Sequence, residues 1–361
     1  MDAKNDKELY ERAMDLYLSG DLMGALNLLG QYLMEHPQHP YALLNTGKIH
    51  YELGNKELAR SYLEAAVKRK PELYEGLRLL ADIYTDRGEL DRAIEAYEKL
   101  VQIRPTADAY NNLGYLYQLK GDYETSIKYF DEAIKLNPRL AEAYYNKALS
   151  YRRLGNFEEA LKWYSKAIEV NPNDPDFYYN RGIVRKKLGD LKGALEDFKK
   201  AVELNPLFVR AYNNMGNIYY SLGEVDKALE MYRKAVEINP GYLDALFNAA
   251  LVLRETGRCR EAVEFYDRIL AISPNNAAAL IDKGICLKEL GDYEGAERLY
   301  KKAAEVDKNF EPLALYNLAC LYNLRGEKEK AREFLRRSFE LDPSLEEYAK
   351  GDDEVKDLLS S

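Results

Sequence analysis

Glycine recurs through the chain at a nearly fixed interval, and this spacing constrains the fold more than any other feature. Seven of the nine intervals are 34 residues long, and the other two are 33 and 35. The recurring residues, called turn glycines below, are Gly20, Gly54, Gly88, Gly121, Gly155, Gly189, Gly223, Gly257, Gly291 and Gly326. A period held over 361 residues indicates one supersecondary unit stacked on copies of itself, which is a solenoid.

Each interval carries the pattern of two amphipathic helices. A small residue such as Ala228 stands five places after the turn glycine, and a large residue such as Tyr232 stands four places further on. Positions four apart lie on the same helix face, so this pair predicts a helix that packs closely against another. A proline ends the second helix in nine of the ten repeats. The turn glycine therefore separates two helices of one hairpin.

This pattern resembles the tetratricopeptide repeat family, whose motif has an aromatic residue, a Leu-Gly pair, a tyrosine, an alanine, an aromatic residue, an alanine and a proline at these spacings. The fourth repeat shows it with Tyr110, Leu113, Gly114, Tyr117, Phe130, Ala133 and Pro138, and with Ser126 in place of the first alanine. The resemblance extends from about Asp6 to Leu345. It implies an all-α fold, a right-handed superhelical α-solenoid of helix-turn-helix units.

The expected organisation is a single solenoid over residues 1–361 with ten repeats. The repeat bounds are 6–39, 40–73, 74–106, 107–140, 141–174, 175–208, 209–242, 243–276, 277–311 and 312–345. Residues 346–361 no longer follow the pattern, and we expect a capping helix there, broken at Gly351, because a terminal repeat lacks a neighbour to cover its open face.

Composition and the absence of known motifs argue against a membrane protein, an enzyme and a metal-binding protein. Charged residues make up 31% of the chain, no apolar run is long enough to span a bilayer, and residues 1–7 are polar, so we predict a cytoplasmic protein without a signal peptide. Phosphate-binding loops, zinc-protease signatures and paired-cysteine sites are absent from the sequence. The three cysteines and three histidines lack metal-ligand spacing. The sequence therefore predicts no enzyme activity, no cofactor and no metal.

An asparagine ladder is the first candidate binding feature. In this family the first helix of each repeat lines a concave groove, and nine places before the turn glycine this chain carries Asn45, Asn112, Asn146, Asn180, Asn214, Asn248 and Asn317. An amide offers a donor and an acceptor to the main chain of any extended peptide. A similar ladder grips peptide backbone in the repeat domain of O-linked sugar transferases, although this sequence contains no transferase domain. The alternative is that each asparagine bonds the neighbouring repeat.

Neighbouring groove positions predict selectivity. The central ones are a mixture of aromatic, amide and aliphatic residues, of which the aromatic and amide ones are Asn111, Tyr115, Tyr145, Tyr179, Asn213 and Asn217. Three places before the turn glycine stand the cations Arg152, Lys186 and Arg254, in a chain whose net charge is −9. A basic strip on an acidic chain indicates an acidic ligand. The alternative is that these cations only complement the ends of their helices.

The sequence therefore predicts a protein-protein interaction scaffold that holds an extended, acidic peptide or protein segment in the groove of repeats four to eight. A structural component that assembles through its convex face or self-associates is the alternative. The negative net charge disfavours nucleic-acid binding. One basic cluster leaves it as a third alternative, and its residues are Arg152, Arg153, Arg185, Lys186 and Lys187. No membrane partner is expected.

Overall fold

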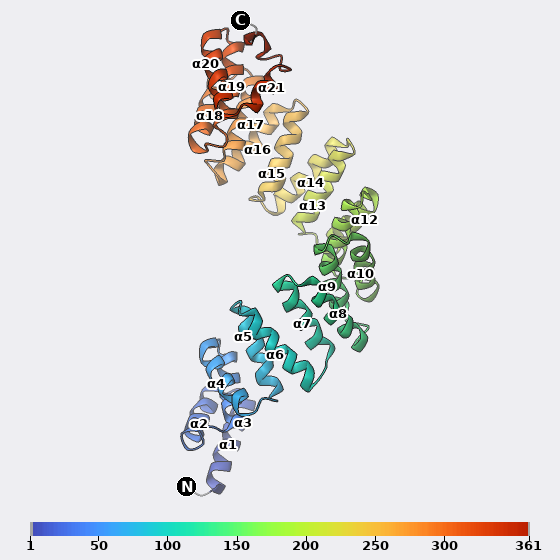
Figure 1. Ribbon diagram of the computed structural model, residues 1–361, viewed down its shortest axis with the longest axis vertical. Helices are drawn as coiled ribbons and strands as arrows, with labels where there is room; N and C mark the ends of the chain where they lie inside the picture. The colour runs from blue at the N-terminus through green and yellow to red at the C-terminus, as the bar shows by residue number, and fades with distance from the viewer. Residues whose placement is uncertain (1–2, 360–361) are drawn as a thin grey trace. The chain divides into compact units, whose positions relative to one another are not determined.

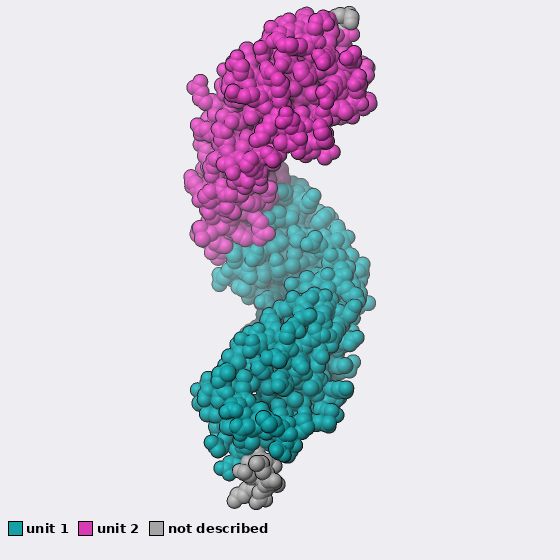
Figure 2. All heavy atoms as spheres, turned by 90° about the vertical axis from the view of Figure 1, so that its left-hand side faces the viewer, with its two compact units in different colours: residues 1–190 teal, residues 191–361 magenta. Residues whose placement is uncertain are grey.

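The structure is a computed structural model that describes residues 3–359. Regular secondary structure within these residues is entirely helical. The chain divides into two compact units, residues 1–190 and residues 191–361, which Figure 2 draws in different colours. The all-α class is thus confirmed, whereas one continuous solenoid over residues 1–361 stays a prediction.

Two helices form each repeat, and their bounds follow the predicted hairpins (Figure 1). Unit 1 contains α1 (Ala3–Leu18), α2 (Leu22–Glu35), α3 (Pro40–Glu52), α4 (Lys56–Arg69), α5 (Tyr74–Asp86), α6 (Leu90–Ile103), α7 (Ala107–Lys120), α8 (Tyr123–Leu136), α9 (Ala141–Arg153), α10 (Phe157–Val170) and α11 (Pro175–Lys187). Unit 2 contains α12 (Leu191–Leu204), α13 (Val209–Ser221), α14 (Val225–Ile238), α15 (Leu243–Glu255), α16 (Cys259–Ile272), α17 (Ala277–Glu289), α18 (Tyr293–Val306), α19 (Glu311–Leu324), α20 (Lys328–Leu341), α21 (Ser344–Ala349) and the 3₁₀ helix η1 (Lys356–Leu358).

Within each unit the helices pack in chain order. The two helices of a repeat pack together, as α7 does with α8, and the second helix packs on the first helix of the next repeat, as α8 does with α9. The turns have the backbone that the glycines predict: all ten turn glycines have φ between 72° and 88°. A side chain is strained in this left-handed region, so glycine is favoured there. Each unit is therefore an α-solenoid.

Small residues let the two helices of a repeat approach closely. A Cβ atom added to Gly216 on α13 would lie 2.4 Å from the ring of Tyr232 on α14, which is 1% exposed. Ala148 on α9 takes the equivalent place against Tyr164, and both residues are fully buried. The core of each repeat thus consists of one small and one large residue on facing helices.

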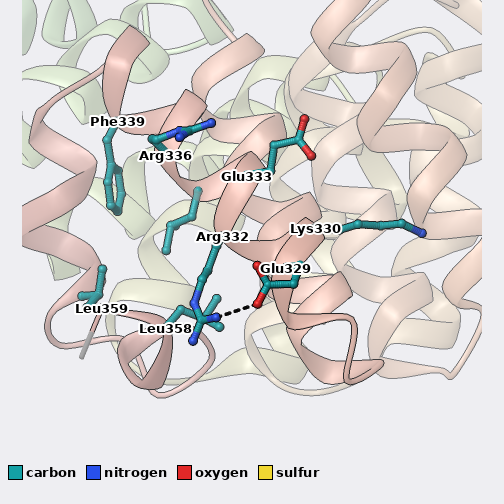
Figure 3. Close-up of a pocket in the computed structure, with 9 residues that line it drawn as sticks. Glu329, Lys330, Arg332, Glu333, Arg336, Phe339, Leu358 and Leu359 are labelled. Carbon is teal, nitrogen blue, oxygen red and sulfur yellow. Dashed lines mark hydrogen bonds and ion pairs between the residues drawn. The ribbon is translucent and has the colours of Figure 1, made fainter. Parts of the chain in front are cut away.

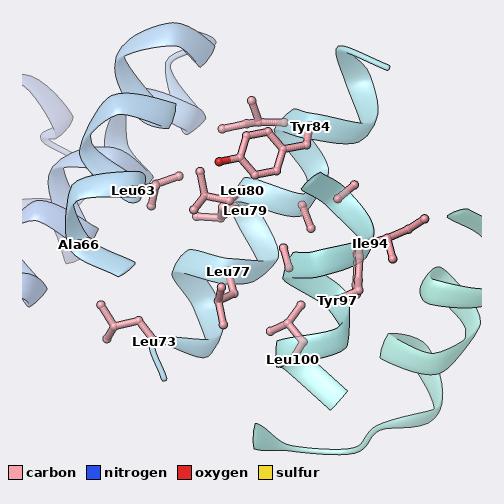
Figure 4. Packing of buried hydrophobic residues seen from close by; sticks show 14 of the residues in the cluster. Leu63, Ala66, Leu73, Leu77, Leu79, Leu80, Tyr84, Ile94, Tyr97 and Leu100 are labelled. Atoms are coloured by element: carbon pink, nitrogen blue, oxygen red, sulfur yellow. The ribbon is translucent and has the colours of Figure 1, made fainter. Parts of the chain in front are cut away.

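Leucines continue this core between repeats. In unit 1, Leu63, Leu77, Leu80 and Leu100 lie in one buried cluster with Tyr84, contributed by α4, α5 and α6 (Figure 4). This cluster buries apolar surface between successive repeats of unit 1, and such burial is the main source of stability in a solenoid.

Two of the buried tyrosines differ in how their hydroxyl groups are satisfied. The hydroxyl of Tyr164 is buried and has no hydrogen-bond partner among the described residues, whereas the hydroxyl of Tyr232 donates to Asn217 Oδ1 at 2.8 Å. A buried polar group without a partner costs free energy, and a satisfied one contributes about 1 kcal/mol.

We therefore expect Tyr164→Phe to raise the free energy of unfolding by about 1 kcal/mol and Tyr232→Phe to lower it by about the same amount. Urea denaturation of the two variants beside the parent chain measures both changes. Shifts of the same sign in the two variants would contradict this description of the core.

The final segment, predicted as a capping helix over residues 346–361 broken at Gly351, contains two short helices within its described residues. Helix α21 begins at Ser344 and ends at Ala349, and irregular chain follows until η1. Ala349 and Val355 are fully buried and Leu358 is 5% exposed, so the segment does cover apolar surface of the last repeat. Residues 360–361 of the predicted cap lie outside the described residues.

Candidate binding face

The first helices of the repeats form one face within each unit. We call inner face the positions ten, nine, six and three places before the turn glycine on these helices. In unit 1 helix α7 contacts α9 directly, and in unit 2 α13 contacts α15, α15 contacts α17 and α17 contacts α19. Corresponding inner-face side chains of successive repeats are therefore neighbours.

The asparagine ladder joins neighbouring repeats through its amide nitrogens. In four repeats, Nδ2 of the ladder asparagine donates to a side-chain oxygen of the previous repeat. The accepting residue stands ten places before the turn glycine of that repeat. The bonds run from Asn45 to Tyr10 (2.8 Å), from Asn146 to Asn111 (3.2 Å), from Asn180 to Tyr145 (3.0 Å) and from Asn248 to Asn213 (2.9 Å). These four amide nitrogens therefore bond the neighbouring repeat, as the alternative interpretation of the ladder predicted.

Two exceptions, Asn112 and Asn317, follow from the residue that the previous repeat offers. Arg78 and Ile281 stand ten places before their turn glycines, and neither side chain has an oxygen to accept a bond. Asn112 accordingly donates to the hydroxyl of Tyr97 at 3.0 Å, and Asn317 donates to a carbonyl of its own helix at 2.8 Å. The main-chain oxygen of Arg210, on the same helix, accepts a hydrogen bond from Asn214 Nδ2 at 3.0 Å.

Burial divides the predicted site residues into two groups. Asn111, Asn180 and Asn213 are only 6 to 7% exposed, so they mainly join repeats. Tyr115, by contrast, is 43% exposed. The other predicted aromatic and amide positions are exposed or half-buried: Asn112, Tyr145, Asn146, Tyr179, Asn214, Asn217 and Asn248.

The amide oxygens retain binding capacity. Among the described residues, no hydrogen bond reaches Oδ1 of Asn112, Asn146 or Asn248. An amide oxygen can accept a main-chain N–H of a ligand while its nitrogen stays bonded within the solenoid. In these three amides the nitrogen is therefore bonded within the solenoid, and no described group bonds to the oxygen.

Cations stand three places before the turn glycine on α9 and α11. Arg152 is half-buried and Arg153 beside it is exposed. Lys186 is half-buried, and this burial, together with the adjacent Lys187, lowers the pKa of its ammonium group. A ligand carboxylate placed here would favour the charged form of Lys186.

In unit 2 the cations three places before the turn glycine are paired with carboxylates of the chain itself. Arg254 on α15 lies 3.8 Å from Asp282, and Lys288 on α17 lies 2.5 Å from Glu354. Asp282 replaces asparagine in the ladder of the ninth repeat, and burial raises the pKa of its carboxyl although Arg254 opposes the shift. The charged form of Asp282 is therefore disfavoured in the folded chain.

This shift predicts a pH dependence. Because the folded pKa of Asp282 is raised, the folded chain binds this proton more readily, so stability is lost as pH rises through the folded pKa. We expect Asp282→Asn to be more stable than the parent at neutral pH, with the difference vanishing below the ordinary Asp pKa of about 3.9. Thermal unfolding of both chains across this pH range measures it, and a difference independent of pH would contradict it.

Residues 352–357 lie against the inner face of α17 and α19. The hydroxyl of Tyr316 donates to Asp352 at 2.6 Å, and Asn323 Nδ2 donates to the main-chain oxygen of Glu354 at 2.8 Å. Tyr316 and Asn323 were not among the predicted site residues. The available signal was their register, since they stand ten and three places before Gly326.

A cleft of about 640 Å³ lies elsewhere, on the side of α20 next to Leu358 and Leu359 (Figure 3). Its walls mix the apolar Phe339 with charged side chains, among them Arg332, which is paired with Glu329 at 2.9 Å. This cleft does not involve the inner face. In the described part of the chain, no helix combines the length and apolar character needed to cross a membrane.

Comparison with known proteins identifies the class of protein that these repeats define. Sequence models described as tetratricopeptide repeats match residues 10–74, 107–140, 129–162, 209–242, 244–309 and 275–344, and one described as a TPR repeat matches residues 81–121, 148–189 and 184–223. The chain belongs to the tetratricopeptide repeat family.

Individual relatives share only part of their length with this chain. It is 26% identical over 140 residues to human tetratricopeptide repeat protein 13, a match that covers 37% of this chain and 16% of the relative. It is 30% identical over 128 residues to the probable UDP-N-acetylglucosamine peptide N-acetylglucosaminyltransferase SEC of Arabidopsis thaliana, which covers 35% of this chain and 13% of that protein. The chain thus spans less than one fifth of either relative.

A solved structure agrees with the fold. The C-terminal part of a TPR repeat-containing protein from Cytophaga hutchinsonii is 18% identical and aligns with a TM-score of 0.56. The alignment covers 66% of this chain and 98% of that one. At this identity the likeness shows the α-solenoid fold alone.

Proposed function

We propose that this chain is a non-enzymatic scaffold that binds an extended, acidic segment of a peptide or protein on its inner face. Tetratricopeptide repeats are protein-interaction modules, and family membership supports a protein partner. The observation that carries the acidic preference is the ion pair of Lys288 with Glu354. Lys288 has the same register as Arg152 and Lys186, so we infer a corresponding place for a ligand carboxylate beside those two cations. Arg254 shares the register but already faces Asp282.

The amide oxygens supply the part of recognition that does not depend on ligand sequence. In unit 1 they belong to Asn112 and Asn146, and in unit 2 to Asn248. Each hydrogen bond contributes about 0.5 to 1.5 kcal/mol, and ordering an extended peptide costs several kcal/mol. The amides of one unit alone therefore give weak binding. Charge-assisted bonds of about 1.5 to 3 kcal/mol each supply affinity and select acidic segments.

Charge variants test this proposal better than amide variants, because the ladder amides also join repeats. We expect Arg152→Gln combined with Lys186→Gln to lose partners that the parent chain retains from an extract of its native host. The matched control is Lys128→Gln combined with Lys166→Gln, which removes two exposed cations from the second helices α8 and α10. Quantitative mass spectrometry compares the three samples.

Partners lost only from the inner-face variant, and rich in aspartate and glutamate at the bound segment, support the proposal. Equal recovery by all three chains would contradict it. Circular dichroism checks that both variants keep the helical content of the parent.

The cleft beside α20 supports a second candidate function, assembly through a face other than the inner one. It joins apolar and charged side chains at the last repeat, where a further helix could pack. This function predicts a molar mass that rises with concentration in light scattering without added ligand. A constant monomer mass would exclude it.

A further inference from the structure

The segment that follows α21 offers carboxylates to the inner face of the last two repeats. Lys288 Nζ lies within 2.5 to 2.6 Å of both carboxylate oxygens of Glu354, and the Lys288 side chain is only 9% exposed. Asn323 Nδ2 donates to Asp357 Oδ1 at 2.9 Å as well as to the main chain of the segment. Together with Tyr316, these donors contact three carboxylates within six residues of chain.

An apolar residue anchors the same segment. Val355 is fully buried and belongs to the core cluster of the last repeat, between the carboxylates of Glu354 and Asp357 in sequence. Cys320 lies on α19 between Tyr316 and Asn323 and is 3% exposed, and its burial, with a smaller contribution from the Glu354 carboxylate, raises the pKa of its thiol. The segment thus covers the inner-face position six places before Gly326 as well.

The contacts have the form of ligand recognition. The amide of Asn323 donates to a main-chain oxygen, Lys288 and Tyr316 bond carboxylates, and the side chain of Val355 is buried in the same segment. Helix α21 ends at Ala349, and between it and η1 the chain has no regular structure, so its conformation here follows its contacts. A plain capping helix would instead bury an apolar stripe at helical spacing.

We propose that residues 351–358 are an intramolecular occupant of an acidic-segment site on α17 and α19, and that an external acidic segment binds there only by displacing them. This inference rests on the proposed function, because it assumes that the inner face binds acidic segments. It adds a definite site, a ligand type of carboxylates around one buried aliphatic residue, and competition by the chain itself.

Tethering sets the strength of the competition. A segment joined by a short linker has an effective concentration in the millimolar range. An external peptide at micromolar concentration therefore binds weakly to the parent chain even when its contacts are the same. Weakening the internal contacts should raise the apparent affinity for the external peptide.

The test uses the full chain and a fluorescent synthetic peptide with the sequence of residues 350–359. In the variant Asp352→Asn, Glu354→Gln, Asp357→Asn, we expect the dissociation constant from fluorescence anisotropy to fall at least about tenfold relative to the parent chain. Adding Lys288→Gln to this variant should remove the gain. Asp353→Asn is the matched control, because the Asp353 side chain is 87% exposed and its ion-pair partner among the described residues is Lys356 of the same segment.

Alkylation of Cys320, located by mass spectrometry, reports the displacement independently. We expect it to speed up in the triple variant and to slow down again when a charge-retaining peptide is added. A triple variant in which Cys320 reacts quickly but which gains no affinity for the peptide would overturn the inference. So would one in which neither readout changes. Either result leaves the pull-down test of the proposed function unaffected, because that test removes cations of α9 and α11.

Discussion

The variant Gly216→Val is expected to lose about 3 kcal/mol of unfolding free energy, the largest effect of any single substitution considered for this chain. A Cβ atom at this position lies 2.4 Å from Tyr232, whose ring is fully enclosed between helices. Valine adds two further methyl groups and is stiff at χ1 within a helix, so the ring and both helices have to move apart. Urea denaturation measures the change.

Two glycine-to-alanine variants are the controls. Gly216→Ala should cost about 1 kcal/mol or less, because Ala148 and Ala250 occupy the equivalent place against tyrosine rings in other repeats. Gly30→Ala on α2 should raise stability by about 0.5 to 1 kcal/mol, because a Cβ there meets nothing within 4 Å and alanine favours the helix. We expect the free energy of unfolding to decrease in the order Gly30→Ala, parent, Gly216→Ala, Gly216→Val. Equal stability of Gly216→Val and Gly216→Ala would contradict the close packing of the two helices.

The second large effect concerns the buried cation of α9. Lys147 has a side chain only 4% exposed, and its ammonium lies 2.5 Å from Asp131 and 3.4 Å from the centre of the Trp163 ring. Removing one partner of a fully buried pair costs about 3 to 5 kcal/mol. Asp131 is 42% exposed and admits water, so we expect Asp131→Ala to cost about 2 kcal/mol.

Lys147→Met separates the charge from the packing. Methionine keeps the apolar stem against Trp163 and needs no counter-charge, so this variant should cost less than about 1 kcal/mol. The double variant should resemble Lys147→Met, giving a coupling energy of about 1 to 2 kcal/mol in the cycle. Glu132→Ala, which breaks the exposed pair with Lys135, should cost less than about 0.5 kcal/mol. Independent, additive effects of Asp131 and Lys147 would contradict the account.

The repeat architecture could be predicted because the same sequence pattern recurs in every repeat. Turn glycines such as Gly121, with a φ of 87°, mark the boundary between helices, and pairs such as Gly216 with Tyr232 mark their contact. These are local constraints, and each depends on residues within one period.

The roles of the ladder amides were harder to predict because they depend on the repeat before. Asn146 and Asn112 occupy the same register, yet one donates to Asn111 and the other to Tyr97. The deciding residue stands ten places before the previous turn glycine, where Asn111 offers an oxygen to Asn146 and Arg78 offers none to Asn112. Reading the two registers together would have found this rule.

The contacts of residues 351–358 with the inner face could not be predicted from the sequence, although a cap on the last repeat was expected. Their chain is irregular, so no helical period shows which face it covers, and the contacts of Glu354 reach Lys288, 66 residues away. A carboxylate-rich stretch alone predicts a solvated segment. Only the register of Lys288 and Asn323 in the folded repeats connects this stretch with the inner face.

Site-specific photo-crosslinking tests the central claim, that the inner face binds an extended acidic segment, most directly. A benzophenone amino acid replaces Tyr115, which is 43% exposed on the inner face of α7, or Lys128, which is exposed on the second helix α8. The account predicts that in host extract the Tyr115 probe crosslinks to partner segments rich in aspartate and glutamate, and that the Lys128 probe does not. Crosslinks to partners from Lys128 alone, or equally from both positions, would contradict it.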